Sequence, residues 1–324
     1  MKGHLQLMAV FTVFLALIPL ISLFDSNPAA ETVSAGGGET VLMLFSGEDT
    51  PEEIPMQDYI IGAVAAQMPA DFGEEALKAQ AVLAHTYALR RRSEEKLSPT
   101  EQLRGADMSD DSSIYQAYFT PEQIRSVYGS DTDEVIKKLY AAAGYAISRT
   151  LTFEGEPIIA AFHAVSCGRT RSALSAWGRD IPYLISVDSS GDADLDICHS
   201  EITLTDEQLF AMLTAAFPDA GLSEDELSVK VTELSPEGCA ATVELCGSTY
   251  VTGEDLAEAA GLPSSCFEVS KGSSGYTFSC MGRGHLVGLS QYGARELAAQ
   301  GSSCEDILAH YFPNAVLTCT EPVI

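Results

Sequence analysis

A glycine-rich loop near the C-terminus combines a histidine and a glutamine in a pattern suited to polar ligands. Residues 282–293 read GRGHLVGLSQYG, with four glycines in twelve residues. This density predicts a tight loop with positive φ angles, or a close approach of a ligand to the backbone. His285 and Gln291 can hydrogen-bond hydroxyl and N-acetyl groups. The loop lacks the Gly-Lys-Ser/Thr of a phosphate-binding loop, which argues against a nucleotide.

A second polar segment carries a histidine, a serine and a cysteine ahead of the only tryptophan. It reads His163-Ala-Val-Ser166-Cys167-Gly, and Trp177 follows. A tryptophan beside a polar loop suits stacking on the face of a sugar ring; burial in a core between two lobes is the alternative. Cys167 and His163 also have the residue types of a nucleophilic pair, without a sequence sign of the third group that would orient it.

Gln67 stands at the end of a predicted helix. Residues 58–66 have a helical pattern, and Pro69 ends it because the residue before a proline is disfavoured in the helical region. Asp71 and Glu74 have the spacing of a capping box at the start of a second helix. A side chain at such a helix end is well placed to enter a cleft. A glutamine there can hydrogen-bond but has no proton to give at neutral pH.

These three segments together resemble the stage II sporulation protein D and amidase-enhancer family. Residues 59–92 read YIIGAVAAQMPADFGEEALKAQAVLAHTYALRRR. Residues 161–170 read AFHAVSCGRT, followed by Ala176-Trp-Gly and Pro182-Tyr-Leu. The glycine-rich loop, which runs into Gln-Tyr-Gly-Ala, is the third match. The resemblance extends from residue 59 to about residue 313.

The resemblance implies a lytic transglycosylase, which cleaves peptidoglycan between N-acetylmuramic acid and N-acetylglucosamine. Cleavage requires a proton on the departing oxygen, and one carboxylic acid with a pKa raised by burial can supply it. In the family, a glutamate at the position of Gln67 is the proposed general acid. The resemblance also implies substrate-binding roles for Lys78, Gln80, His85, His163, Ser166, Trp177, Tyr183, His285 and Gln291.

Four positions depart from the family pattern at or near these segments: Gln67, His85, Cys167 and Leu286. The usual residues there are glutamate, arginine, glycine and glycine. The departures favour a protein that binds glycan strands in endospore formation but is catalytically weak or inactive. One alternative is an active transglycosylase that uses another acid: Glu75, Glu74 or Asp71. Another is an enhancer of a cell-wall amidase.

The zinc motif of some family members is missing. Those members have Cys-x4-His-Cys just before Gln-Ala-Tyr; here Gln116-Ala-Tyr118 is intact, but the matching positions hold Ser109, Ile114 and Tyr115. None of these is a normal zinc ligand, so we expect no metal and no other cofactor. A relocated metal site is the alternative, built from Cys167, Cys198, His163 and His199.

The chain has eight cysteines, an even number that permits disulfides outside the cytoplasm. They are Cys167, Cys198, Cys239, Cys246, Cys266, Cys280, Cys304 and Cys319. Cys239 and Cys246 bracket one extended segment and lie too far apart to pair. Cys266 and Cys280 lie symmetrically about a turn at residues 272–274, which makes them the best candidates for a disulfide.

Composition limits the class of partner. The chain has 324 residues, of which 46% are hydrophobic, enough for a packed core. Its net charge of −28 repels the phosphate backbone, so we exclude nucleic acid as a partner. The expected partners are peptidoglycan glycan strands and, as the resemblance implies, membrane-anchored sporulation proteins and a cell-wall amidase.

The N-terminus predicts an extracytoplasmic location. Residues 1–24 form a signal-anchor or a cleaved signal peptide, because residues 5–24 are mostly apolar and long enough to span a bilayer. Residues 25–39 are small and polar and read as a flexible linker. The body of the protein is then membrane-anchored on the outer side, or secreted if the segment is cleaved.

The remaining pattern predicts the α+β class, in which strands dominate from about residue 145 but a helix is expected over residues 205–217. We expect one domain over residues 40–324, with an N-terminal lobe over about 40–150 and two lobes around a glycan-binding cleft. The matched segments should meet there, with Gln67 near His285. One helix is expected over residues 121–143, and hairpins over residues 228–245 and 267–280.

Overall fold

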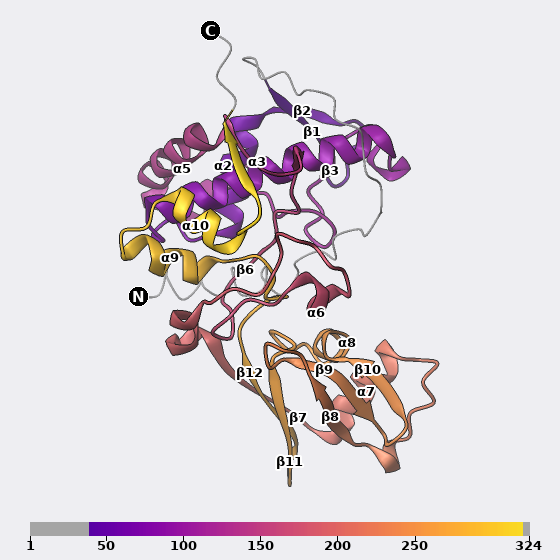
Figure 1. Cartoon of the computed structure of the whole chain (residues 1–324). Helices are drawn as coiled ribbons and strands as arrows, with labels where there is room; N and C mark the ends of the chain where they lie inside the picture. The colour runs from indigo at the N-terminus through magenta and orange to yellow at the C-terminus, as the bar shows by residue number, and fades with distance from the viewer. Residues whose placement is uncertain (1–38, 320–324) are drawn as a thin grey trace. The chain divides into compact units, whose positions relative to one another are not determined.

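A computed structural model describes residues 39–319 (Figure 1). They divide into two compact units, one made of the residues up to 161 and from 294 onward, the other of residues 162–293. The predicted signal-anchor and nearly all of the predicted linker lie outside the described residues. Within the described part of the chain, no helix is both long and apolar enough to cross a membrane. The mixture of helices and small sheets confirms the α+β class.

The first unit is built on three helices that pack together (Figure 1). They are α2 (Met56–Gln67), α3 (Glu74–Leu97) and α5 (Thr132–Ala146). From Tyr59 to its last residue, every side of α2 is buried, as expected for a helix that is apolar all round. Many of their buried residues are alanines, whose small size lets helix backbones approach closely.

The turn between α2 and α3 confirms one prediction and corrects another. Met68 is extended, with φ −134° and ψ 133°, so α2 ends at Gln67 and does not continue into Pro69, as predicted. The capping box at Asp71 is wrong, because α3 begins at Glu74 with Gly73 as its N-cap and no side-chain cap. Gly73 has φ 90°, a conformation that favours glycine and brings the chain into the helix later than the sequence spacing suggests.

Two small sheets and three short helices complete this unit. β1 (Thr40–Leu44) pairs antiparallel with β2 (Glu52–Pro55) and parallel with β3 (Met108–Ser109). β4 (Arg149–Phe153) lies between β14 (Val316–Cys319) and β5 (Glu156–Pro157). The helices are α4 (Pro121–Tyr128), α9 (Gln291–Ala299), within which the chain passes from the second unit into the first, and α10 (Cys304–Tyr311).

The helix predicted over residues 121–143 is in fact two helices. Thr120 caps α4 in a capping box with Gln123, as its sequence suggests. The helix then stops at Gly129, whose φ of 55° and ψ of −118° lie outside the helical region. A short 3-10 turn, Gly129–Asp131, leads into α5.

The second unit has two antiparallel three-stranded sheets (Figure 1). One has the order β10 (Thr249–Thr252), β9 (Ala240–Leu245), β8 (Val229–Leu234), and the other β11 (Phe267–Gly272), β12 (Gly275–Met281), β7 (His199–Leu204). α7 (Asp206–Ala216) and α8 (Gly253–Ala259) pack with them around one apolar cluster. The unit also has a short parallel pair, β6 (Phe162–His163) and β13 (Leu289–Ser290), and a short helix, α6 (Ala173–Trp177); β6 carries His163 and α6 ends at Trp177.

Both predicted hairpins are present, but the register of β11 and β12 makes the predicted Cys266–Cys280 disulfide wrong. Gly272 pairs with Gly275, which places Cys280 opposite Phe267. Cys266 is therefore displaced by one position, and successive side chains of a strand point to opposite faces. Cys280 packs in the core with Phe267, while Cys266 lies in a different cluster. All eight cysteines fall in the described part of the chain, and all are free thiols.

Candidate functional site

Gln67 is the last residue of α2, and its side chain is only 4% exposed. Its amide nitrogen donates to the carbonyl oxygen of Ala117 over 2.9 Å. Its amide oxygen accepts a hydrogen bond of 2.8 Å from Gln80, a buried residue of α3. The orientation of both amides follows from chemistry, because a backbone carbonyl can only accept. Gln67 must turn its NH₂ toward Ala117, so its oxygen faces the NH₂ of Gln80.

The Gln116-Ala-Tyr118 segment is held against α2 in the position that this contact requires. The Tyr59 hydroxyl donates to the Gln116 side chain over 3.2 Å, and the rings of Tyr59 and Tyr118 stack with centroids 6.0 Å apart. A side chain at Gly62 would meet the Tyr118 ring at 2.2 Å, so only glycine permits this approach. Sequence reasoning identified the Gln-Ala-Tyr motif but missed that its backbone carbonyl is a partner of Gln67.

The carboxylates near Gln67 in sequence have structural partners. One oxygen of Glu75 accepts from the backbone N–H of Cys304 at the start of α10, and the other from Lys78, each over 2.8 Å. Glu74 pairs with Lys78 at 2.7 Å, and its side chain is 71% exposed. The Lys78 ammonium lowers the pKa of Glu74, which keeps this acid ionised. Asp71 is exposed.

The predicted substrate-binding residues Lys78 and His85 are also tied into the first unit. Lys78 pairs with Glu74 and Glu75, which form the first turn of α3, and both glutamates raise its pKa. The buried His85 donates from Nδ1 to the carbonyl oxygen of Arg149 over 2.8 Å, which links α3 to β4. Its Nε2 lies 3.6 Å from a carboxylate oxygen of Glu39.

In the second unit, the structure brings three predicted residues together. The ring centroids of His163 and His285 lie 6.1 Å apart, and that of Trp177 lies 5.3 Å from His285, edge to face in both cases. His163 comes from β6, His285 from the glycine-rich loop and Trp177 from the end of α6. Trp177 is only partly buried, which leaves part of its ring available to a ligand.

Both histidines are neutral at physiological pH. Burial lowers the pKa of His163 to about 4 and, helped by the charge of His163, that of His285 to about 3. His163 Nδ1 donates to the Val287 carbonyl over 3.2 Å, so its Nε2 holds the lone pair, and this atom has no hydrogen-bond partner among the described residues. The Val287 N–H donates to His285 Nδ1 over 3.0 Å, so His285 carries its proton on Nε2. Because His163 is fully buried, only the partly exposed His285 of this pair can face a ligand.

Asp192 is a buried residue of this region that sequence reasoning missed. Its Oδ2 accepts from the backbone N–H of Ser166 at 2.9 Å and from the hydroxyls of Ser189 at 2.9 Å and Ser290 at 2.6 Å. Ser290 is paired with His163 in the two-stranded ladder. Asp192 thus ties the histidine segment to the end of the glycine-rich loop. It sits in an aspartate-rich stretch in which nothing in the sequence marks one acid as buried.

The other predicted residues of this unit are buried. Ser166 is fully buried, and its hydroxyl accepts from the Gly168 N–H over 3.2 Å. Tyr183 is 7% exposed, and Gln291, which begins α9, is 1% exposed. The meeting of Gln67 with His285 in one cleft stays a prediction.

Two of the four departures from the family pattern, Cys167 and Leu286, belong to one cluster. Leu286 is fully buried with Cys239 and Cys266, and Cys167 packs against them. Leu286 has φ 62°, in the left-handed region that costs a residue with a Cβ about 1–2 kcal/mol and costs glycine almost nothing. A glycine would therefore fit this backbone, but it would leave the apolar side of the thiol cluster unfilled.

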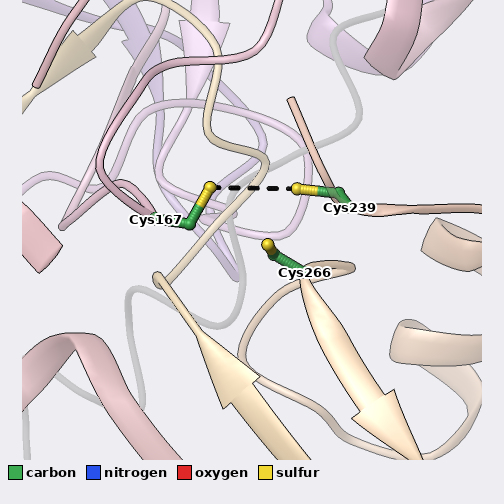
Figure 2. A group of neighbouring side chains, drawn as sticks. All are labelled: Cys167, Cys239 and Cys266. Atoms are coloured by element: carbon green, nitrogen blue, oxygen red, sulfur yellow. Dashed lines mark hydrogen bonds between the residues drawn. The ribbon is translucent and has the colours of Figure 1, made fainter. Parts of the chain in front are cut away.

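The thiol cluster is the only place, within the described residues, where three or more histidine, cysteine or acidic ligand atoms come close enough to hold a metal ion. It consists of Cys167, Cys239 and Cys266 (Figure 2). Hydrogen bonds from the other two thiols lower the pKa of Cys167 to about 3. The predicted grouping of Cys167 with Cys198 and two histidines is wrong, because Cys198 donates to the Ser166 carbonyl and His199 bonds the Ala193 carbonyl.

Comparisons with known proteins point to the same family as the three segments of the sequence that resemble it. Residues 46–151 match the family model described as stage II sporulation protein. Stage II sporulation protein D of Bacillus amyloliquefaciens is 34% identical over 267 residues, which cover 81% of this chain and 73% of that protein. Stage II sporulation protein D of Bacillus subtilis (strain 168) is 32% identical over 294 residues, covering 90% and 82%. An amidase enhancer of the same strain is 26% identical over 307 residues, covering 79% and 40%.

Proposed function

Because the chain belongs to the stage II sporulation protein D family, we propose that it acts in sporulation by binding the glycan strands of peptidoglycan and cleaves them weakly or not at all. The binding residues we propose are those that the resemblance points to, with Trp177, His163 and His285 as the central group. The proposal for weak catalysis rests on a single position, Gln67. Membrane anchoring through residues 1–24 and an extracytoplasmic location are part of the same proposal.

The observation that carries the proposal is the locked amide of Gln67. The resemblance places the general acid of an active relative at this position. Here both ends of the amide are engaged, with NH₂ on the Ala117 carbonyl and oxygen on Gln80. An amide cannot protonate a departing glycosidic oxygen. General acid help is worth about 10²–10⁴-fold, so its loss reduces cleavage by about that factor.

The same surroundings are suited to a protonated glutamate. A carboxyl group at position 67 would need its proton to donate to the Ala117 carbonyl, while Gln80 would donate to its other oxygen. Burial and this hydrogen bond both favour the neutral form and would raise the pKa of the acid. These surroundings therefore support the view that a protonated glutamate fits position 67, which here holds an amide of similar shape.

The alternative acids are less suited to the role. Glu75 is committed to the N-terminus of α10 and to Lys78. Glu74 is exposed, and the neighbouring ammonium lowers its pKa, the opposite of what a general acid at neutral pH requires. These contacts favour structural roles and weaken the reading of an active transglycosylase with a replacement acid.

The second unit offers the features expected of a sugar-binding surface. Trp177 presents a partly exposed ring edge to face with His285. The neutral His285 is partly exposed and carries its proton on Nε2, which can donate to hydroxyl or N-acetyl groups, while the fully buried His163 lies beside its ring. These contacts support binding independently of any acid.

The experiment that tests this proposal uses the full chain in detergent with denuded glycan strands. Co-sedimentation measures binding, and mass spectrometry of the supernatant measures anhydro products. We expect wild type to bind with anhydro products near background. Loss of binding would overturn the proposal. Abundant anhydro products from wild type would establish the active-transglycosylase alternative instead.

Enhancement of a cell-wall amidase is a second candidate function, favoured by the similarity to a protein named amidase enhancer. Such an enhancer needs no general acid, so Gln67 is compatible with it. The test measures release of stem peptides from purified wall by an amidase with and without the chain. A rate increase that survives substitution of Gln67 by leucine would support this role. An unchanged amidase rate would reject it.

A further inference from the structure

Three cysteines from separate segments of the second unit converge on one point (Figure 2). Cys167 lies in the loop after β6, Cys239 directly before β9, and Cys266 directly before β11. Their sulfur atoms all lie within 4.8 Å of one another, and the Cys167 and Cys239 sulfurs are 4.0 Å apart. Each side chain turns its sulfur toward the other two.

This spacing is that of thiolates around a metal ion. A tetrahedral zinc ion with Zn–S bonds of about 2.3 Å holds its sulfurs about 3.8 Å apart. A disulfide requires about 2.05 Å between two sulfurs and leaves the third without a partner. Three sulfurs at nearly metal-site separation, rather than one close pair, favour a shared central cation.

We propose that Cys167, Cys239 and Cys266 form a three-thiolate site for one thiophilic d10 cation, Zn²⁺ or Cu⁺. Soft thiolate ligands select these ions over Mg²⁺, Ca²⁺ or Mn²⁺. A metal ion binds cysteine as thiolate, so its binding competes with protons for the thiols. The site lies wholly within residues 162–293 and is separate from Ser109, Ile114 and Tyr115, the positions where zinc-carrying relatives hold their ion.

Burial and charge around the cluster suit this role. Cys239 is fully buried and Cys266 nearly so, while Cys167 is partly exposed and gives an ion a route of entry. Leu286 covers the apolar side. Three thiolates around Zn²⁺ leave one net negative charge. The buried Arg171 guanidinium, which donates to the Ser265 hydroxyl over 2.8 Å next to Cys266 and also pairs with Glu254, is the cation beside this charge.

Zn²⁺ and Cu⁺ differ in how many ligands they would need at this site. No fourth histidine, cysteine or acidic ligand joins the group among the described residues. Cu⁺ is satisfied by three sulfurs in a plane, whereas Zn²⁺ would complete four-coordination with water. In either case the ion would join the Ser166 loop to the starts of β9 and β11, and so fix the loop that follows His163.

The test uses the full chain in detergent, reduced and handled without oxygen. Co²⁺ serves as a spectroscopic probe of thiolate ligation and is then displaced by Zn²⁺; a separate arm titrates Cu⁺ against a chromogenic competitor. We expect one ion per chain. Cys167→Ser, Cys239→Ser and Cys266→Ser should each weaken Co²⁺ binding by more than about 100-fold, because even changes outside the ligand set cost about 10–100-fold.

Cys198→Ser is the matched control, because this buried thiol donates to the Ser166 carbonyl and is outside the cluster. It should leave the stoichiometry unchanged. Alkylation of the wild type gives a readout that needs no substitution: bound Zn²⁺ or Cu⁺ should protect the partly exposed Cys167, located by peptide mass spectrometry, relative to the metal-free chain. A reduced chain that binds no stoichiometric ion would overturn the proposal, as would protection that maps elsewhere. A disulfide between two of these cysteines that, once reduced, gives no metal binding would overturn it as well.

Discussion

The Gln80 side chain donates a hydrogen bond of 2.8 Å to the amide oxygen of Gln67, joining α3 to the end of α2. Both side chains are almost completely buried. Together with the Ala117 carbonyl, Gln80 fixes which end of the Gln67 amide faces which neighbour. The position matched to a catalytic acid is therefore an ordered part of the first unit and not a loose surface residue.

Removing this contact should cost stability. Gln80→Leu removes a hydrogen bond between two buried side chains, which typically costs about 0.5–1.5 kcal/mol. Urea unfolding monitored by circular dichroism measures the free energy of unfolding. Gln102→Leu is the control, since Gln102 is exposed and its substitution should change stability by less than about 0.5 kcal/mol. Equal stability of the two variants would contradict the proposed contact.

Trp177 should contribute to glycan binding. Trp177→Ala removes the ring that lies beside His285, and we expect about 10-fold weaker binding to glycan strands, or about 1.4 kcal/mol. Co-sedimentation over a range of strand concentrations measures the affinity. Leu174→Ala tests the same short helix at a residue that is 58% exposed, and it should bind like wild type. If both variants bind equally well, Trp177 has only a packing role.

The buried His163 should make stability depend on pH. Its pKa falls from 6.5 to about 4 on folding, chiefly through burial, while Asp192 and Cys167 act in the opposite direction. The unfolded chain binds more protons, so this contribution is fully present above pH 6.5 and is lost as the pH falls toward 4. The shift corresponds to about 3 kcal/mol.

His163→Asn tests this directly, because an amide can donate to the Val287 carbonyl in place of Nδ1 without titrating. Urea unfolding of both proteins at pH 7 and pH 4 should give a smaller loss of stability for the variant. An identical pH dependence would show that His163 is not neutral and buried in the folded chain.

Glu75 should prove structural. Glu75→Gln removes a carboxylate from the N-terminus of α10, which typically costs about 0.5–2 kcal/mol, and should leave glycan binding and anhydro products unchanged. Thermal unfolding and the cleavage assay together separate the two roles. Glu74→Gln, at an exposed position, is the control for charge removal. Cleavage by wild type that disappears in Glu75→Gln would identify Glu75 as the acid.

Local rules predicted the features that depend on neighbouring residues. The end of α2 follows from the restriction that Pro69 places on Met68, and the cap of α4 follows from Thr120 and Gln123. The start of α3 could not be predicted, because the φ of 90° at Gly73 depends on how the turn is packed. The hairpin register failed for a similar reason: a turn displaced by one residue reverses the face of every later side chain.

The candidate site residues that lie within recognisable sequence motifs were predictable. His163, Trp177 and His285 were identified as residues of two separate segments, and the structure brings their rings together. Asp192 and the Cys239–Cys266 neighbourhood were not, because they depend on contacts between residues far apart in the sequence. Cys167 and Leu286 depart from the family pattern in two separate segments, and the structure packs them together in one cluster.

The central claim, that Gln67 alone withholds the proton needed for cleavage, is tested most directly by Gln67→Glu. The full-length variant and wild type are incubated with denuded glycan strands, and anhydro products are measured by mass spectrometry; Gln67→Leu controls for loss of the hydrogen bonds. We expect Gln67→Glu to raise the cleavage rate by about 10²–10⁴-fold over wild type with glycan binding unchanged, and we expect the cleavage rate of Gln67→Leu to stay at background. Cleavage by wild type at a rate that the Glu variant does not exceed would contradict the account.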